Sequence, residues 1–174
     1  MEAGDQLEKE ILRMYYDLYN RNLSRLCSKL CGNRQDAEDL FQDTWVKTIK
    51  NIDRYDNKQE FDKWLFSVCC NNYKNMLRSK SRRPNLYDFT SNSEKDSFLN
   101  NMPNDTKLQE EYIDLHNIIN KLNSKLRIII ILFYFDNLSI KNIAEILHIP
   151  SGTVKNRLFK ARNIIRERMA GYEQ

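Results

Sequence analysis

The sequence predicts an all-α protein composed of two small helical domains that are joined by a flexible acidic linker. Only four glycines and three prolines occur among its 174 residues, so long stretches lack the residues that break helices. Apolar side chains recur at three- and four-residue steps in both halves of the chain, as they do in amphipathic helices. The length accommodates two small domains, and the charge distribution indicates where they divide.

Charge separates the chain into three segments. Residues 1–83 hold 16 basic and 13 acidic side chains, residues 84–120 hold 2 and 7, and residues 121–174 hold 10 and 4. Residues 84–105 are rich in Asn, Ser and Asp and show no sustained period, which is typical of a linker. Domains are therefore expected at 1–83 and 106–174. Two basic modules joined by an acidic segment favour binding to a long polyanion.

The composition also bears on the compartment. The longest apolar run, Ile128–Phe135, is far shorter than the ~20 residues that cross a bilayer. Met1–Glu10 carries four carboxylates and no apolar segment, unlike a signal peptide. We therefore expect a cytoplasmic protein without direct membrane insertion.

Four cysteines occur, and a reducing compartment leaves them unpaired. They are either small core residues or a zinc site, because Cys27 and Cys31 share a helical face on which Cys69 and Cys70 could close. Adjacent cysteines seldom bind one metal together, and no C-x-x-C spacing is present, so the core interpretation is favoured.

The first module begins with a helix that ends at Gly32. Its apolar stripe consists of Leu7, Ile11, Met14, Tyr15, Leu18, Leu26 and Leu30. Either Asn33 or Asp36 caps the next helix, whose apolar face carries Ala37, Leu40, Phe41, Thr44, Trp45 and Ile49. The opposite face of this helix carries an acidic ridge, which we define as Glu38, Asp39, Gln42 and Asp43.

A short polar loop, residues 53–58, precedes a third helix that Pro84 terminates. Its apolar positions are Phe61, Trp64, Leu65, Val68 and Leu77, and Trp64 is expected in the core rather than as a platform for a base. Residues 74–83 contain five cations and no acid, a pattern that favours contact with phosphates.

The second module opens near Asp105 or Thr106 with a helix whose apolar residues are Leu108, Tyr112, Leu115, Ile119 and Leu122. The next apolar run, Ile128–Phe135, has the composition of a buried strand. A strand without partners leaves its backbone edges unsatisfied, so we predict a buried helix capped by Ser124.

The last segment has the pattern of a helix-turn-helix. Ser139 is expected to cap a short helix, residues 148–150 form the turn, and Ser151 is expected to cap a longer helix. Ala144 provides the small residue at the crossing, and Val154 and Leu158 bury the seam. The outer face of the second helix then presents residues that can contact phosphates and base edges, namely Lys155, Asn156, Phe159, Lys160, Arg162 and Arg166. The alternative is a solvated basic helix.

These motifs resemble the bacterial sigma-70 family. Residues 122–130 (LNSKLRIII), 138–147 (LSIKNIAEIL) and 152–162 (GTVKNRLFKAR) resemble region four of that family. Region two is resembled by Asp36-Ala-Glu-Asp39, Gln42-Asp-Thr44, Phe61, Trp64-Leu65, Asn71 and Arg78. Because nothing of regions one or three fits, the chain resembles the small extracytoplasmic-function (ECF, group 4) type, over about residues 7–83 and 105–169.

The resemblance implies partners and sites. It implies that the acidic ridge of Glu38, Asp39, Gln42 and Asp43 docks on a coiled coil of the largest RNA polymerase subunit, with the flap region as a second contact. For the minus-10 element, Tyr55, Asp56 and Asn57 would hold a flipped base, and the following helix would bind the strand through Lys63, Asn71, Lys74 and Arg78. For the minus-35 element, it implies base contacts from Lys155, Asn156, Phe159 and Lys160 and phosphate contacts from Ser151, Thr153 and Arg157. An anti-sigma factor is a further expected partner, and neither a cofactor nor a catalytic residue is implied.

Two other functions compete with this interpretation. A nucleic-acid enzyme would use the carboxylates Asp36, Glu38, Asp39 and Asp43 to hold Mg²⁺, but no nucleophile and base accompany them. A stand-alone helix-turn-helix repressor explains the second module and leaves the acidic ridge without a function. The sequence therefore favours a promoter-specificity subunit of RNA polymerase.

Overall fold

The structure is a computed structural model that describes residues 2–55, 58, 60–82 and 106–171. The elements in chain order are α1 (Glu2–Leu30), α2 (Arg34–Lys50), the 3₁₀ turn η1 (Ile52–Arg54), α3 (Phe61–Arg82), α5 (Thr106–Asn120), α6 (Ser124–Ile130), the π-helical turn η3 (Ile131–Phe135), α7 (Ile140–Leu147) and α8 (Ser151–Ala170). The described residues contain no strand, which confirms the all-α prediction. The predicted linker, residues 84–105, lies outside the described residues.

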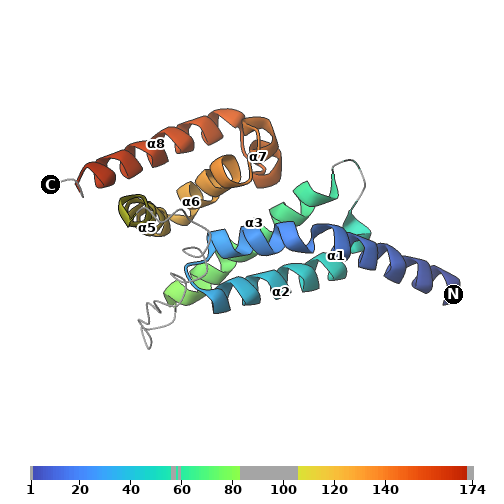
Figure 1. The fold of residues 1–174 in the computed structure, drawn as a ribbon. Coiled ribbons are helices and arrows are strands. Elements are labelled where there is room, and N and C mark those ends of the chain that lie inside the picture. Colours follow the sequence, from blue (N-terminus) through green and yellow to red (C-terminus); the bar gives the residue numbers. More distant parts are fainter. Residues whose placement is uncertain (1, 56–57, 59, 83–105, 172–174) are drawn as a thin grey trace.

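The helices form two packed groups (Figure 1). Helices α1, α2 and α3 pack on one another, and α5, α6 and α7 all contact α8. The groups meet where α3 contacts α6 and α7 and where α1 contacts η3. None of the described helices is both long enough and apolar enough to cross a bilayer.

The core of the first group differs in register from the predicted stripe of α1. Ile11, Met14 and Leu18 were expected inside but are 40%, 55% and 61% exposed. The predicted Leu26 and Leu30 are buried, together with Leu23, Cys27 and Cys31. This correction has a geometric cause, because at this level α2 and α3 meet another face of α1, on which Tyr16 contacts Trp45 and Tyr15 stacks on Phe61. An apolar stripe is buried only where a neighbour covers it.

Helix α2 also departs from its predicted face at one position. Ile49 is 49% exposed, whereas Thr48 is fully buried. Thr44, which is also fully buried, satisfies its hydroxyl by donating to the Leu40 carbonyl at 2.7 Å. Polar threonines can therefore occupy a helical core face that sequence periodicity assigns to larger apolar residues.

Side-chain caps explain where several helices begin. Asn33 caps α2 by accepting from the Asp36 backbone N–H at 2.8 Å, and Ser139 caps α7 as predicted. Two predicted caps are wrong. Asn123, rather than Ser124, caps α6 and accepts from the Leu126 N–H at 3.1 Å; Ser151 is the first residue of α8 and Pro150 holds the cap position without a side-chain hydrogen bond. A cap residue is itself non-helical. In both cases the residue before the serine has the extended backbone that a cap requires, and the serine is already the first residue of the helix.

The apolar run Ile128–Phe135 is helical, as predicted, and its first five residues are buried. Its second half widens into a π turn, in which Asp136 N–H donates to Ile131 O at 3.2 Å. The chain then turns back through Leu138 N–H, which donates to Leu132 O at 3.0 Å. This widening exposes Tyr134 (49%) while Leu132 stays in the core.

The α7–α8 pair has the predicted helix-turn-helix geometry. His148 ends α7 in the left-handed conformation, with φ of 52°, and Ile149 N–H donates back to Ala144 O at 3.0 Å. The seam is closed by Val154 and Leu158, which are 0% and 3% exposed. The turn thereby fixes the direction in which α8 leaves the domain.

We predict that one half-buried histidine makes the second group sensitive to acid. His116 on α5 has a pKa that burial and, to a smaller extent, the charge of Arg127 lower from its ordinary value. Its contribution is thus present above about pH 6.5, the unfolded pKa, and is lost as pH falls through the folded pKa. The free energy of unfolding, measured with urea at pH 7.5 and 5.0, should fall less in His116→Gln than in the wild type. Equal losses in the two proteins would contradict this assignment.

Candidate polymerase- and nucleic-acid-binding surfaces

The acidic ridge lies on the outer face of α2. All four of its residues, Glu38, Asp39, Gln42 and Asp43, are exposed. Glu38 accepts from Arg34 at 2.7 Å in a solvent-exposed pair, while Asp39 and Asp43 have no ion pair within the described residues. Their carboxylates are therefore available to a cationic partner.

The ridge continues as an apolar strip that sequence reasoning missed. Val46 and Ile49 are 47% and 49% exposed and follow Asp39, Gln42 and Asp43 at helical spacing on α2. Residues 39, 42, 46 and 49 follow one another at three- and four-residue steps, so the sequence already placed them on one helical face. Ile49 was nevertheless assigned to the core. Exposed aliphatic residues beside acids are typical of a protein-binding face.

Buried polar contacts hold α2 firmly on α3. Lys47 donates to the side-chain oxygen of Asn72 at 2.6 Å, and Asn72, which is 6% exposed, donates to Thr44 Oγ1 at 3.4 Å. Asp36 is not part of the ridge, because it pairs with Lys80 on α3 and accepts from Asn33. The ridge is therefore presented by a helix whose position is fixed from behind.

Aromatic side chains gather at the start of α3. The Tyr55 ring lies 5.3 Å from both Phe61 and Trp64, and Tyr15 of α1 stacks on Phe61 at 4.0 Å. Trp64 is half-buried and packs on the core. Of the predicted base pocket, Tyr55 is placed beside this cluster, whereas Asp56 and Asn57 lie outside the described residues.

The predicted strand-binding residues share one face of α3. Lys63, Asn71, Lys74 and Arg78 are spaced at helical steps along it, and Lys74 donates to Asn71 Oδ1 at 3.4 Å. The structure brings Asn71, Lys74 and Arg78 together on an open surface. Lys63 differs, because its side chain is only 19% exposed and pairs with Glu60 and with Glu145 of α7, each at 3.2 Å.

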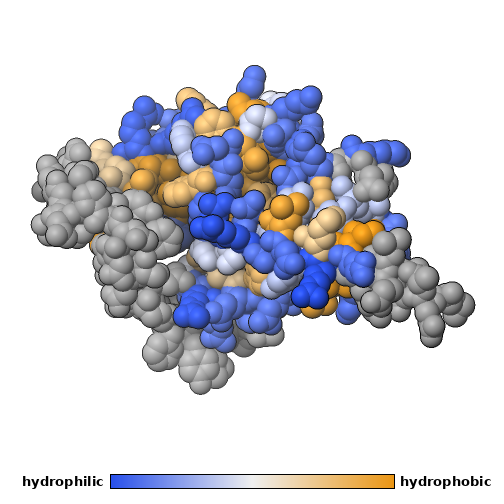
Figure 2. Space-filling model, turned by 45° about the vertical axis from the view of Figure 1, so that its right-hand side comes forward, coloured by the Kyte–Doolittle hydropathy of each residue, from blue (hydrophilic) through white to orange (hydrophobic). Residues whose placement is uncertain are grey.

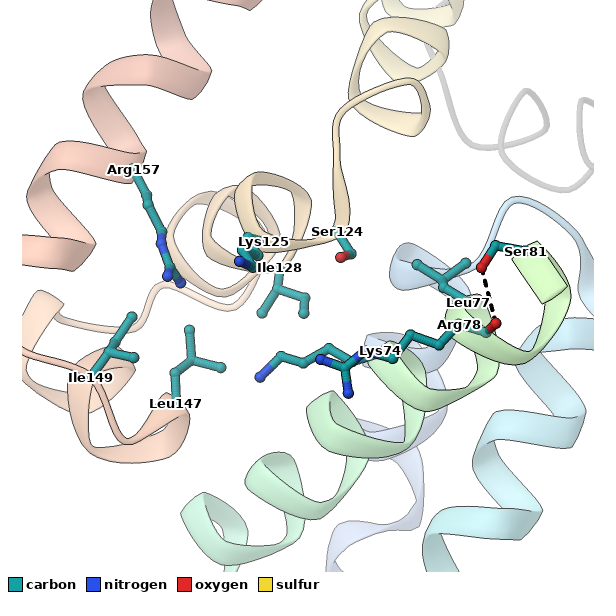
Figure 3. Close-up of a pocket in the computed structure, with 10 residues that line it drawn as sticks. All are labelled: Lys74, Leu77, Arg78, Ser81, Ser124, Lys125, Ile128, Leu147, Ile149 and Arg157. Atoms are coloured by element: carbon teal, nitrogen blue, oxygen red, sulfur yellow. Dashed lines mark hydrogen bonds between the residues drawn. The ribbon is translucent and has the colours of Figure 1, made fainter.

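A basic groove lies between the two groups of helices (Figure 3). It has a volume of about 410 Å³. Lys74 and Arg78 of α3 and Lys125 and Arg157 of the second group line it, over apolar side chains that include Ile128 and Leu147. Among the described residues, none that lines the groove is acidic, so these side chains present positive charge from both groups.

The outer face of α8 presents the residues predicted to contact the minus-35 element. Ser151, Lys155, Asn156, Phe159 and Lys160 are exposed, with Phe159 at 64%, and Thr153 and Arg157 are half-buried. Further along, Arg162 donates to the Tyr134 hydroxyl at 2.6 Å and lies over the Phe133 and Tyr134 rings. Arg162 is therefore held against η3, whereas the first three turns of α8 keep their outer face free. Figure 2 shows that the exterior of the molecule mixes polar and apolar residues.

The cysteines are core residues. All four are buried and free, and the Cys27 and Cys69 sulfurs lie 3.7 Å apart across α1 and α3. In the part of the chain that the structure describes, no three or more His, Cys, Asp or Glu side chains are grouped so as to hold a metal ion. Neither the zinc alternative nor the Mg²⁺ alternative gains support from this geometry.

Family models match both halves of the chain. The model "Sigma-70 region 2" matches residues 15–83, and the model "Sigma-70, region 4" matches residues 112–165. The ECF RNA polymerase sigma factor SigW of Bacillus subtilis is 32% identical over 97% of this chain and 92% of its own length. The RNA polymerase sigma-H factor of Pseudomonas aeruginosa is 28% identical over 95% of this chain and 88% of its own.

Solved structures share the fold. The sigma factor RpoE of Bartonella quintana, crystallised with the anti-sigma factor NepR, aligns with a TM-score of 0.67 at 23% identity, over 91% of this chain and 96% of that one. CnrH, in complex with the cytosolic domain of CnrY, aligns with a TM-score of 0.66 at 18% identity, over 94% of this chain and 90% of that one.

We predict that the four thiols react slowly in the folded protein. Burial raises the pKa of Cys31 and Cys70, and a hydrogen bond with Cys27 followed by burial raises that of Cys69, so few thiolates exist near neutrality. Ellman's reagent at pH 8 should modify the native protein at least about tenfold more slowly than the protein in guanidinium. EDTA should leave the native rate unchanged; an accelerated rate would revive the zinc interpretation.

Proposed function

The chain belongs to the ECF branch of the sigma-70 family of RNA polymerase sigma factors, and we propose how its surfaces divide that function. Residues 1–83 form the domain that docks on core polymerase and opens the minus-10 element, residues 84–105 are the linker, and residues 106–174 form the domain that recognises the minus-35 element. The observation that supports this division is the separation of charge. The acidic ridge faces outward on α2, whereas the basic faces lie on α3 and α8.

The acidic ridge is the docking surface for the coiled coil of the largest polymerase subunit. Glu38, Asp39, Gln42 and Asp43 supply acceptors, and Val46 and Ile49 supply apolar area next to them. Charged rims raise association rates, and a central apolar contact contributes most of the affinity. The polymerase flap is the second core contact and is expected to engage the domain of residues 106–174.

The minus-10 strand binds along α3. Asn71, Lys74 and Arg78 contact its backbone, joined by Lys63, and Tyr55 with Asp56 and Asn57 holds a base that leaves the stack. These contacts favour the single-stranded form, so binding energy rather than a bond-changing reaction drives strand opening. The protein itself has no catalytic activity and needs no cofactor in this proposal.

The minus-35 duplex binds the exposed first turns of α8. Asn156 suits adenine, Lys155 suits guanine, and Phe159 can contact a thymine methyl group, with Lys160 beside them. Ser151, Thr153 and Arg157 hold phosphates on either side and set the register of the helix in the major groove.

An anti-sigma factor is a proposed regulator. The sigma factor RpoE of Bartonella quintana was co-crystallised with an anti-sigma factor, and CnrH, which shares the fold, was solved in complex with the cytosolic domain of CnrY. Polymerase and chromosome are cytoplasmic in bacteria, so we propose that this chain acts there. A stand-alone repressor is the alternative, and it would bind duplex DNA tightly without polymerase.

The experiment that tests the function combines two measurements. The purified chain should co-elute with RNA polymerase core and then direct run-off transcription from a subset of a promoter-fragment library. Tight duplex binding by the chain alone, without co-elution or initiation, would replace the sigma-factor assignment with the repressor.

We expect Asp39→Ala combined with Gln42→Ala to weaken core binding about tenfold, or ~1.4 kcal/mol, because both side chains are exposed on the ridge. Binding of a minus-35 duplex should not change. Asp17→Ala with Gln35→Ala removes the same residue types from exposed positions of the same domain and serves as the control. Unchanged core affinity in the ridge variant, measured by fluorescence anisotropy, would remove the docking assignment.

We expect Lys155→Ala combined with Asn156→Ala to change which minus-35 sequences are used. Each good base contact contributes roughly 1–3 kcal/mol of discrimination, so selection from a randomised upstream element should lose preference at two neighbouring positions. Arg168→Ala, at the far end of α8, should leave the preference intact. A uniform loss over all sequences would make Lys155 and Asn156 phosphate contacts.

A further inference from the structure

One exposed cation on α8 is held by aromatic side chains of the turn that precedes the helix-turn-helix. The Arg162 nitrogen Nε donates to the Tyr134 hydroxyl at 2.6 Å. The guanidinium carbon lies 5.7 Å from the centroid of the Phe133 ring and 5.5 Å from that of the Tyr134 ring, within the ~6 Å over which an aromatic face attracts a cation. Three separate contacts therefore fix the orientation of this guanidinium.

Both rings belong to the π turn η3. Leu132 in this turn is fully buried, whereas Tyr134 is 49% exposed. Phe133 is half-buried and packs on the core, and its ring contacts the Tyr134 ring edge-on with centroids 5.0 Å apart. Phe133 thus anchors the pair while Tyr134 extends to the surface beside α8, and π turns of this kind are frequent at functional sites.

The contact with Arg162 is not needed to hold α8 in place. Val154, Leu158 and Ala161 are at most 3% exposed and already fasten this helix to the core. Arg162 itself is exposed, and an exposed polar contact contributes little to folding. Holding an exposed cation in one orientation instead reduces the conformational entropy that is lost when a ligand binds it.

The part of the guanidinium that remains free suits a phosphate. Arginine has five N–H donors, and the hydrogen bond to Tyr134 uses only the one on Nε. Within the described residues, Arg162 forms no ion pair with a carboxylate. The two terminal nitrogens therefore keep their donors, and such a fork matches two oxygens of a phosphate.

The place of Arg162 along α8 fits the DNA backbone rather than a base. Exposed side chains follow one another on one face of this helix at three- and four-residue steps, namely Lys155, Phe159, Arg162 and Arg166. Arg162 lies ~10 Å beyond Lys155 at 1.5 Å per residue, and the major groove is ~12 Å wide. When Lys155 contacts a base edge, Arg162 is therefore at the border of the groove, where the phosphates lie. Arg166, ~16 Å beyond Lys155, is outside it.

We propose that Tyr134 is a positioning residue that holds Arg162 ready to bind a phosphate at the border of the minus-35 element. The proposal rests on the proposed contact of α8 with the minus-35 duplex, and it adds a residue from outside the helix-turn-helix. Tyr134 accepts from Nε and, together with Phe133, supports the charge, while the terminal nitrogens of Arg162 bind the phosphate. The guanidinium enters the complex already ordered.

A double-mutant cycle in the holoenzyme tests this role. Core polymerase is combined with each variant, and binding to a fluorescent promoter fragment selected in run-off transcription is measured at several KCl concentrations. Arg162→Ala should weaken binding about tenfold and reduce the dependence of log K on log salt by ~0.9, the value for one phosphate contact. Tyr134→Phe keeps the ring and removes the accepting hydroxyl, so it should weaken binding about threefold. Added to Arg162→Ala, it should cause no further loss.

The control is Arg166→Ala, which removes the same charge one turn further along the same face. It should reduce the salt dependence clearly less than Arg162→Ala does, and the urea midpoint of Tyr134→Phe should equal that of the wild type. An equal loss from Tyr134→Phe with and without Arg162 would overturn the positioning role, and so would no loss in either background. An unchanged salt dependence in Arg162→Ala would remove the phosphate contact.

Failure of the proposed function is distinguishable from failure of this inference. Selective initiation by the wild type, together with independent effects of Tyr134 and Arg162, would refute the positioning role and leave the minus-35 assignment intact. If the chain instead binds duplex DNA without polymerase, the same cycle is measured on the free chain with that duplex. The role of Tyr134 is thereby decided under either function.

Discussion

The Arg127 guanidinium links the ends of helices from both halves of the molecule. It donates to Ile119 O and Leu122 O of its own domain at 3.1 and 3.5 Å, and to Leu30 O and Tyr73 OH of the other. Leu30 is the last residue of α1, so the cation lies at a helix C-terminus, where the backbone carbonyls carry partial negative charge. Burial raises the pKa of Tyr73 to about 12, which keeps its hydroxyl neutral beside the cation. One partly buried charge thereby satisfies acceptors from three helices and orients α6 on the first domain.

Helix α3 is constrained in a related way, because one of its faces packs in the core and another carries polar side chains. Leu65, Cys69, Cys70 and Tyr73 are at most 1% exposed and bind the helix to α1 and α2 through close packing. The face at Lys63, Asn71, Lys74 and Arg78 stays polar along the same helix. Since the core face fixes the rotation of the helix, the polar face has one direction, toward α7 and the groove. A substitution that rotated α3 would move the cations and the core together.

The sequence predicted most of the features that local chemistry decides, although the caps of α6 and α8 were each placed one residue too late, and it failed where neighbouring helices decide. Breaker spacing, the Ser139 cap and the helix-turn-helix seam depend on residues near one another in the chain, and the structure has all three. Ile11, Met14 and Leu18 have correct helical periodicity yet are exposed, because burial depends on which face of α1 another helix covers. The position of Lys63 under Glu145 joins residues 82 apart in sequence, and no local pattern specifies such a contact. Similarly, the spacing of α2 showed both the acidic ridge and its apolar extension, but Ile49 was assigned to the core, because an aliphatic side chain at helical spacing suits a buried face as well as an exposed one.

The charge pattern that predicted two basic modules also explains why the contact between them contains both acidic and basic side chains. If the two basic surfaces met directly, repulsion between them would hold the domains apart at low salt. The molecule instead places isolated acids at the contact, Asp136 against Lys29 and Glu145 against Lys63, and leaves the remaining cations around an open groove. Asp136 is half-buried, and burial raises its pKa while Lys29 lowers it, so the pair depends on the two domains staying together. These two pairs are largely shielded from solvent, because the side chains of Lys29 and Asp136 are 19% and 12% exposed and that of Lys63 is 19% exposed. Removing one partner would therefore leave a poorly solvated charge at the contact between the domains.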